Sequence, residues 1–282
     1  MKTVAIDIGG TKFSVAAFDG DQMVRRESRS TDREGGRHWL VPQLDQLLSE
    51  WKRDTTFDRC GIGFGGPVNF ATQMVEQSTH VGGWEGFPLT RHISETLGVP
   101  VSMDNDANVG ALGEYYYGAG KGCSPLFYMT VSTGIGGGIL VDGQNLRGAD
   151  GWSGEIGHIN LVPDGPECLC GSNGCLERMC CGLWMERDYG RSAEELLQDP
   201  AFVERYVVLL ARGLKTCIMV LNPARIVIGG GISKAGDRLF VPLRAELGRQ
   251  ITKWSGARQD VQPAALGDDS VLYGALRLAK TI

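Results

Sequence analysis

One histidine and three cysteines lie within eighteen residues of one another in the second half of the sequence. They are His158, Cys168, Cys170 and Cys175. Imidazole nitrogen and thiolate sulfur are the ligands that structural zinc prefers, and four of them complete a tetrahedron. Gly171 and Gly174 would let the intervening loop wrap around an ion. The spacing therefore predicts a structural zinc site, and three buried thiols with an unrelated histidine are the alternative.

Two glutamates flank this cysteine loop. Glu155 precedes His158 by three positions, and Glu177 follows Cys175 by two. A zinc ion would fix both carboxylates on a rigid scaffold, where they could accept hydrogen bonds from sugar hydroxyls. A zinc-bound imidazole also keeps one ring nitrogen for another partner. Solvated surface charge is the alternative for each glutamate.

A glycine-rich turn follows the first apolar stretch of the chain. Its residues are Asp7, Ile8, Gly9, Gly10, Thr11 and Lys12. Glycines at a hairpin tip allow backbone N–H groups to approach an anion without an intervening side chain. Thr11 adds a hydroxyl donor, Lys12 adds a positive charge, and Asp7 could hold a hydrated magnesium ion. These residue types together predict phosphate binding. A tight turn with a solvated charge is the alternative.

Two further glycine clusters follow apolar stretches in the second half. The first contains Ser132, Thr133, Gly134, Ile135, Gly136, Gly137 and Gly138, and the second contains Gly229, Gly230 and Gly231. Because glycine is costly in a strand without a closely approaching partner, the first cluster predicts a second phosphate-binding tip, with a bulged hairpin as the alternative. The second lacks the spacing of a dinucleotide fingerprint and suits a flat surface for a nucleoside.

Acidic and amide side chains stand between a strand and a helix at residues 104–108. The sequence there is Asp104-Asn105-Asp106-Ala107-Asn108. A carboxylate at a helix N-terminus is held ionised by the local dipole and can accept a proton from a hydroxyl during phosphoryl transfer. Asp and Asn are also ordinary N-cap residues. One residue could cap the helix while another performs the chemistry.

The elements that must position these residues alternate through both halves of the chain. Residues 3–8 and 12–18 are expected to form two strands around the first glycine turn, and 126–132 and 138–141 repeat this arrangement around a turn at 134–138. Further strands are expected at 23–30, 60–64, 99–103 and 225–228, and helices at 40–51, 88–97, 107–117, 202–221 and 270–280. This mixture predicts an α/β fold of two lobes, with the boundary near residues 118–124.

Composition excludes several classes of protein. The chain has 282 residues, of which 42% are hydrophobic and 22% charged, and its formal net charge is −5. An acidic chain lacks the basic excess that general nucleic-acid binding requires. No stretch is apolar enough for a signal peptide or a membrane span. We therefore expect a cytoplasmic protein without nucleic-acid or membrane partners, whose eight cysteines stay reduced.

The motifs, taken in order, resemble the ROK family of sugar kinases, transcriptional repressors and open reading frames. The resemblance rests on residues 7–12, 104–108 and 131–158, on the cysteine loop, and on residues 272–276 near the end. It implies a two-lobed, actin-like ATPase fold of the ribonuclease H-like kind, with ATP and sugar in the cleft between the lobes. The expected domains are an N-terminal lobe, 1–117, joined by the last helix from about 270 to 282, and a C-terminal lobe, 118–269, with the zinc loop.

The resemblance also implies roles for individual residues. Asp106 is implied to be the catalytic base that activates the sugar 6-hydroxyl. The residues implied to bind sugar are Gly66, Asn105, Asp106, Glu155, His158 and Glu177. Those implied to bind ATP and Mg²⁺ are Asp7, Gly9, Gly10, Thr11, Lys12, Thr133, Gly134, Gly136, Gly137, Gly230 and Gly231. His158 is also implied to ligate zinc with Cys168, Cys170 and Cys175, so that zinc braces the sugar-binding side chains and takes no part in catalysis.

The activity that the resemblance implies is transfer of the ATP γ-phosphoryl group to a hexose, with glucose favoured. N-acetylmannosamine, N-acetylglucosamine and fructose are the alternative acceptors, and a sugar-sensing protein without turnover is the alternative of another class. Family repressors carry a helix-turn-helix ahead of the first glycine motif, which here begins at residue 7, so an enzyme is expected.

Two positions depart from the family pattern. His80 stands where many glucose-specific members carry asparagine, and Cys180 and Cys181 replace the small residues usual after Glu177. The sequence does not choose between ATP and polyphosphate as donor. A homo-oligomer, either a dimer or a tetramer, is expected.

Overall fold

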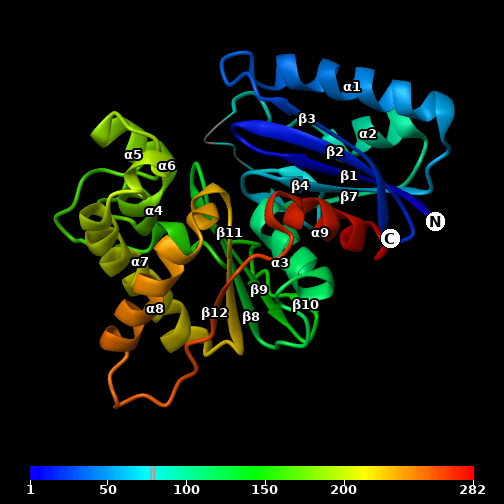
Figure 1. Cartoon of the computed structure of the whole chain (residues 1–282). Helices are drawn as coiled ribbons and strands as arrows, with labels where there is room; N and C mark the ends of the chain where they lie inside the picture. The colour runs from blue at the N-terminus through cyan, green and yellow to red at the C-terminus, as the bar shows by residue number, and fades with distance from the viewer. Residues whose placement is uncertain (77, 79–80) are drawn as a thin grey trace. The chain divides into compact units, whose positions relative to one another are not determined.

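The computed structural model describes residues 1–76, 78 and 81–282, so that His80 lies outside the described residues. The chain divides into two compact units (Figure 1). Unit 1 comprises Met1–Tyr116, Arg147–Trp152 and Asp269–Ile282, and unit 2 comprises Tyr117–Leu146 and Ser153–Asp268.

Unit 1 is built on a five-stranded sheet of order β3-β2-β1-β4-β7. Its strands are β1 (Lys2–Ile8), β2 (Lys12–Asp19), β3 (Gln22–Ser30), β4 (Arg59–Phe64) and β7 (Val101–Asn105), and a small second sheet pairs β5 (Val68–Asn69) with β6 (Met74–Val75). Its helices are α1 (Gly36–Asp54), α2 (Leu89–Leu97), α3 (Asp106–Tyr117) and α9 (Ser270–Ala279). β1 and β2 form an antiparallel hairpin, whereas β1, β4 and β7 run parallel.

The register of the parallel strands in unit 1 decides which residues share one edge of the sheet. Ile8 pairs with Phe64, and Phe64 pairs with Asn105, so β1, β4 and β7 end together. The core beneath them includes the apolar face that helical spacing predicts for α1. The chain leaves these strand ends through the Gly9 turn, Gly65 and Asp106, so the edge brings together residues from two predicted motifs, 7–12 and 104–108.

Helix α9 lies directly on β4 and α3 because glycines remove the side chains between them. A Cβ built on Gly61 would lie 2.0 Å from the Ala275 carbonyl oxygen, and one on Gly113 would lie 2.0 Å from the Ser270 carbonyl oxygen. The Ser270 hydroxyl also donates to Glu114 Oε1 at 2.7 Å in the buried interior. The C-terminal helix is therefore part of the core of unit 1.

Replacing Gly274 of α9 with alanine is expected to destabilise the protein by about 3 kcal/mol, because the new Cβ would overpack a rigid backbone contact. That Cβ would lie 1.7 Å from the Val109 carbonyl oxygen. Gly248→Ala is the matched helical control, since its Cβ would meet only Gln259 Oε1 at 3.7 Å. The free energy of unfolding of the control should rise by roughly 0.5–1 kcal/mol. Calorimetric unfolding of both variants measures the difference in stability.

Unit 2 repeats the hairpin and parallel strands of unit 1. Its sheet has the order β10-β9-β8-β11-β12. The strands are β8 (Leu126–Val131), β9 (Ile135–Val141), β10 (Gln144–Asn145), β11 (Arg225–Gly229) and β12 (Val261–Pro263). β8 and β9 are antiparallel, and β11 lies parallel to both β8 and β12. The predicted repetition of architecture between the two halves is therefore present.

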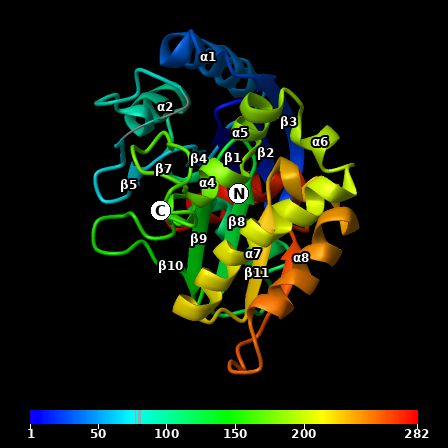
Figure 2. The ribbon, with the colours of Figure 1, turned by 90° about the vertical axis from the view of Figure 1, so that its left-hand side faces the viewer.

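Helices cover the sheet of unit 2. They are α4 (Leu176–Cys180), α5 (Gly182–Tyr189), α6 (Ala193–Leu196), α7 (Pro200–Leu221) and α8 (Asp237–Gln250), with 3₁₀ turns η1 (Ile156–His158), η2 (Gly231–Ala235) and η3 (Gly267–Asp269). α7 and α8 lie over β8 and β11 and share one core with them (Figure 2). Asp199 caps α7 by accepting from Ala201 N at 3.0 Å, and Asn222 ends it in a left-handed conformation.

The second glycine turn is shorter than predicted. The expected turn at 134–138 is wrong, because β9 begins at Ile135 and residues 136–138 pair with β8. The bend between β8 and β9 occupies residues 132–134 only. Gly137 of β9 lies against the backbone of Gly154, which leaves no room for a side chain. No helix in the described ranges is long and apolar enough to cross a membrane.

Candidate functional site

The strand ends of unit 1 place Asp106 beside the first glycine turn. Gly9 N donates to Lys12 O at 3.0 Å to close the turn, and Gly65 N donates to Ile8 O at 2.8 Å. A Cβ on Gly65 would lie 3.5 Å from Asp106 Oδ2 and 3.5 Å from the Gly9 Cα. The predicted phosphate turn and the predicted base are therefore neighbours within one unit.

Asn105 caps helix α3, and Asp106 follows it as the first residue of the helix. Asn105 Oδ1 accepts from Ala107 N at 3.0 Å and from Asn108 N at 3.3 Å, as an N-cap side chain does. Its Nδ2 donates to Gly66 O at 3.0 Å. Asp106 is then the first residue of the helix, where the dipole favours an ionised carboxylate. The cap is thus supplied by Asn105 and not by Asp106, the predicted base, and the Asn105 amide also holds Gly66.

A buried ion pair fixes the strand end before Asn105. Asp104 is 1% exposed, and its Oδ2 accepts from Arg147 Nε at 2.9 Å and Nη2 at 2.8 Å. Asn108 Nδ2 donates to its Oδ1 at 3.2 Å, and the Arg147 guanidinium lies 3.6 Å from the centre of the Phe70 ring. Arg147 was not predicted as a site residue, because it lies 43 residues from Asp104 and outside the glycine, acidic and cysteine clusters.

The corresponding edge of unit 2 joins the second and third glycine clusters. Gly182 N, at the start of α5, donates to Ser132 O at 2.7 Å, and Leu183 N donates to Thr133 O at 3.3 Å. Gly230 has φ +83°, and a Cβ there would lie 2.4 Å from Val131 O. The carboxyl ends of β8 and β11 therefore lie side by side and bring these predicted nucleotide residues together.

The same contacts explain the unusual cysteine pair that follows Glu177. Cys180 is the last residue of α4 and Cys181 lies between α4 and α5, and both are fully buried. Burial raises the pKa of the Cys181 thiol to about 12. Tyr206 donates its hydroxyl to Cys180 O at 2.9 Å. The pair therefore serves as small neutral core side chains that let α5 reach the 132–134 turn.

Three predicted sugar-binding side chains gather in unit 2. Glu177 is 8% exposed and its Oε2 accepts from Ile135 N at 2.9 Å, so its position is set by the start of β9. Burial raises the pKa of Glu155, the nearby His158 opposes that change in pKa, and Glu177 adds to it. Glu155, His158 and Glu177 therefore share one electrostatic environment, with the carboxylates drawn from two separate segments.

Glycines bring the loop that carries Glu155 and His158 against β9. A Cβ on Gly154, which has φ +92°, would lie 2.3 Å from Gly137 O, and one on Gly157 would lie 2.2 Å from Ile135 O. A Cβ on Gly137 would in turn lie 2.5 Å from Gly154 O. Gly154 and Gly157 were missed as positioning residues, and the paired spacing with the β9 glycines is the signal that could have found them.

The four predicted zinc ligands converge. The donor atoms of His158, Cys168, Cys170 and Cys175 all lie within 4.8 Å of one another. Cys170 Sγ lies 3.6 Å from Cys175 Sγ, and Cys168 Sγ lies 3.9 Å from His158 Nδ1. Tetrahedral ligands about 2.3 Å from a zinc ion would be about 3.8 Å apart. The cluster is thus compatible with structural zinc, with Nδ1 as the ligating nitrogen.

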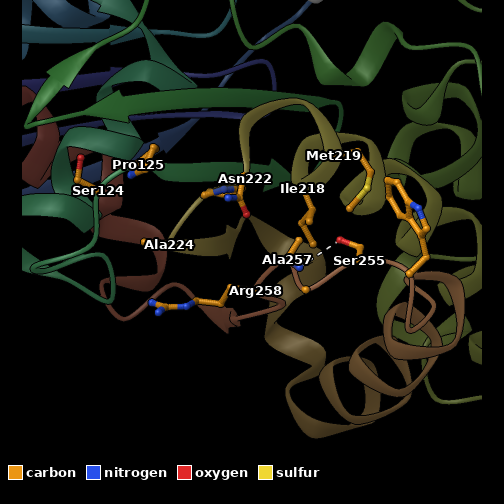
Figure 3. A pocket seen from close by; sticks show the side chains of 12 residues that line it. Ser124, Pro125, Ile218, Met219, Asn222, Ala224, Ser255, Ala257 and Arg258 are labelled. Carbon is orange, nitrogen blue, oxygen red and sulfur yellow. Dashed lines mark hydrogen bonds between the residues drawn. The ribbon is translucent and has the colours of Figure 1, made fainter.

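One hollow in unit 2 is lined by none of these residues. It has a volume of about 710 Å³ and is lined by residues that precede β8 and β11, such as Pro125 and Ala224, and by the segment 254–258 (Figure 3). None of its lining residues belongs to a predicted motif. It therefore adds nothing to the candidate site.

Two units that each place a glycine-tipped hairpin beside parallel strands define an actin-like ATPase fold. The chain belongs to the ROK family, whose model matches residues 3–282. It is similar to the crystal structure of a ROK family glucokinase from Streptomyces griseus in complex with glucose and AMPPNP. That similarity has a TM-score of 0.87 and 26% identity, and it covers 100% of both chains.

Sequence relatives include kinases of two sugars. The chain is 31% identical to a glucokinase from Thermotoga maritima, over 99% of this chain and 98% of the relative. It is 29% identical to an N-acetylmannosamine kinase from Haemophilus influenzae, over 100% of this chain and 96% of the relative. The predicted family is thereby confirmed.

Proposed function

We propose that the protein is an ATP-dependent hexose kinase that phosphorylates the 6-hydroxyl of glucose. The observation that carries this proposal is the position of Asp106, first in α3 and beside the Gly9 turn, with Asn105 taking the capping role. A carboxylate in this position is suited to accept the proton of an attacking hydroxyl. Full-length similarity to glucokinases supports the activity.

The glycine edges of the two units are proposed to hold the nucleotide. In unit 1 these residues are Asp7, Gly9, Gly10, Thr11 and Lys12, and in unit 2 they are Thr133, Gly134, Gly136, Gly137, Gly230 and Gly231. Mg²⁺ bound with ATP would neutralise charge on the transferring phosphoryl group. Backbone N–H groups, the Thr11 hydroxyl and the Lys12 ammonium would position that group, which is the main contribution a protein makes to phosphoryl transfer. Gly137 would act through packing, because its Cα faces Gly154.

Sugar binding is proposed to use Glu155, His158 and Glu177, together with Gly66, Asn105 and Asp106. The three unit 2 side chains would accept or donate hydrogen bonds to ring hydroxyls. Their gathering in one environment, with Glu177 held by Ile135 N, supports this role. Asn105 would contribute mainly by orienting Gly66 and Asp106, since both ends of its amide already make bonds within the unit.

Zinc is proposed as a brace for that group of side chains. Cys175 immediately precedes α4, the helix that carries Glu177, and His158 ends the turn that follows Glu155. An ion held by both residues would tie the two segments together. With Nδ1 on the metal, His158 Nε2 would stay available to a sugar hydroxyl.

Glu155→Gln is expected to raise the glucose KM by about tenfold, because an amide accepts from a hydroxyl more weakly than a carboxylate does. The KM for ATP should stay within about twofold. Steady-state kinetics with each substrate varied would measure both constants. Glu194→Gln, a change of an exposed glutamate in α6, is the matched control. An unchanged glucose KM in Glu155→Gln would remove Glu155 from the sugar site.

Sugar choice is tested by a coupled assay of ATP consumption against glucose, N-acetylmannosamine, N-acetylglucosamine and fructose. We expect the protein to show its highest kcat/KM with glucose. A preference for N-acetylmannosamine would favour the second candidate, which similarity to the Haemophilus influenzae kinase supports. Glucose binding without ATP consumption would instead identify a sugar-sensing protein.

A further inference from the structure

Arg33 contacts the first glycine turn although it lies in none of the predicted motifs. Its Nε donates to Gly10 O at 2.8 Å, and its Nη2 donates to Thr11 Oγ1 at 3.0 Å. Thr31 donates its backbone N–H to Thr11 O at 2.8 Å and its hydroxyl to Gly9 O at 3.1 Å. Three consecutive carbonyl oxygens of the turn therefore each accept a bond from Thr31 or Arg33.

These bonds decide which way the peptide groups of the turn face. In a planar trans peptide the C=O and the following N–H point in opposite directions. Since Gly9 O faces Thr31, the Gly10 N–H points away from Thr31, and since Gly10 O faces Arg33, the Thr11 N–H points away from Arg33. In these two peptide groups each N–H is thereby directed away from the residue that binds its carbonyl oxygen, an orientation in which the N–H groups of a turn can face an anion.

Arg33 also acts on the Thr11 hydroxyl. Thr11 Oγ1 accepts from the guanidinium, so the hydroxyl hydrogen is directed away from Arg33. The guanidinium brings a permanent positive charge to the turn. Its planar set of donors reaches two acceptors at once, whereas a lysine ammonium at the end of a flexible stem cannot bridge them in the same fixed geometry.

We propose that Arg33 is a positioning residue for nucleotide phosphate binding, which sets the peptide orientation of the Gly9–Thr11 turn and directs the Thr11 hydroxyl. The inference rests on the proposed kinase function. It assigns no contact between Arg33 and the nucleotide, because the guanidinium binds the Gly10 carbonyl oxygen. Its effect on ATP should therefore be transmitted through the turn and through Thr11.

Arg33→Gln is expected to raise the ATP KM about tenfold or more, since two charge-assisted hydrogen bonds to the turn are lost. The glucose KM should stay within about twofold and the melting temperature should not change, because Arg33 is exposed. Arg33→Lys should raise the ATP KM by less than Arg33→Gln does, without restoring the wild-type value. Arg26→Gln is the matched control, as this arginine of β3 pairs instead with Asp269.

A double-mutant cycle separates a role through Thr11 from a general charge effect. If Arg33 acts through the Thr11 hydroxyl, the double variant Arg33→Gln, Thr11→Val should raise the ATP KM by less than the product of the two increases seen in the single variants. Multiplicative effects would overturn that part of the inference. An unchanged ATP KM in Arg33→Gln, with glucose-dependent turnover intact, would overturn the whole inference and leave the kinase standing.

Nucleotide binding provides a readout that does not need turnover. Calorimetric titration with AMPPNP and Mg²⁺ should show the same loss of affinity in Arg33→Gln and none in Arg26→Gln. If the wild-type chain binds AMPPNP but consumes no ATP with glucose, the kinase proposal fails while the titration still decides the role of Arg33. Equal AMPPNP affinity in wild type and Arg33→Gln would contradict the inference.

Discussion

Asp106→Asn is expected to lower kcat by a factor of about 10²–10⁴, the range that general-base catalysis commonly supplies. The amide keeps the shape of the side chain but cannot take a proton from the sugar hydroxyl. Because Asn105 provides the helix cap, α3 should form normally in the variant. The KM values for glucose and ATP should change by no more than a few fold, and steady-state kinetics would measure all three constants.

The control for this change is Asp19→Asn, which alters an exposed carboxylate of the same unit. It should retain full turnover. Equal melting temperatures for the two variants would show that the loss in Asp106→Asn is chemical and not a loss of folding. Turnover unchanged in Asp106→Asn would contradict the mechanism, because no other residue is proposed to accept the proton.

Cys170→Ser is expected to remove most of the zinc and to destabilise unit 2 by about 3 kcal/mol or more, since a metal that binds only the folded chain contributes its binding energy to folding. Elemental analysis should find about one zinc ion per wild-type chain and well under half of one in the variant. The glucose KM should rise as well, because Cys175 and His158 flank the segments that carry Glu177 and Glu155.

Cys123→Ser is the matched control, because Cys123 is also partly accessible and lies outside the cluster. It should keep its zinc and its melting temperature. A wild-type protein without zinc, together with normal folding of Cys170→Ser, would refute the zinc proposal. Loss of zinc with an unchanged glucose KM would instead refute only the idea that zinc braces the sugar side chains.

Local sequence patterns predicted much of the fold. The buried face of α1 follows from the helical spacing of its apolar residues, and the hairpin of residues 2–19 follows from the glycines of its turn. Both signals act over only a few residues of sequence. The convergence of His158 with the cysteines also follows from short spacing. The prediction of a turn at 134–138 was wrong because glycine occurs both at bends and in strands that another backbone segment contacts. Spacing alone does not separate a bend from a strand that another backbone touches, as Gly137 and Gly154 touch here.

The parts of the site that were missed depend on contacts between distant segments. Arg147 reaches Asp104, and Arg33 reaches the Gly9 turn, only after the sheet of unit 1 has formed. Isolated arginines carry no spacing signal, so no local pattern distinguishes these two from solvated charges. That Asn105 caps α3 while Asp106, the proposed base, begins the helix likewise became evident only from the structure. The expected homo-oligomer stays a prediction.

The most direct test of the central claim is to follow the phosphoryl group itself. Wild-type protein would be mixed with ATP, Mg²⁺ and glucose, and the products would be observed by ³¹P NMR. The account predicts glucose 6-phosphate and ADP in equal amounts, with formation of the sugar phosphate abolished or nearly so in Asp106→Asn. ATP that stays intact in the presence of bound glucose, or a phosphate on another hydroxyl, would contradict it.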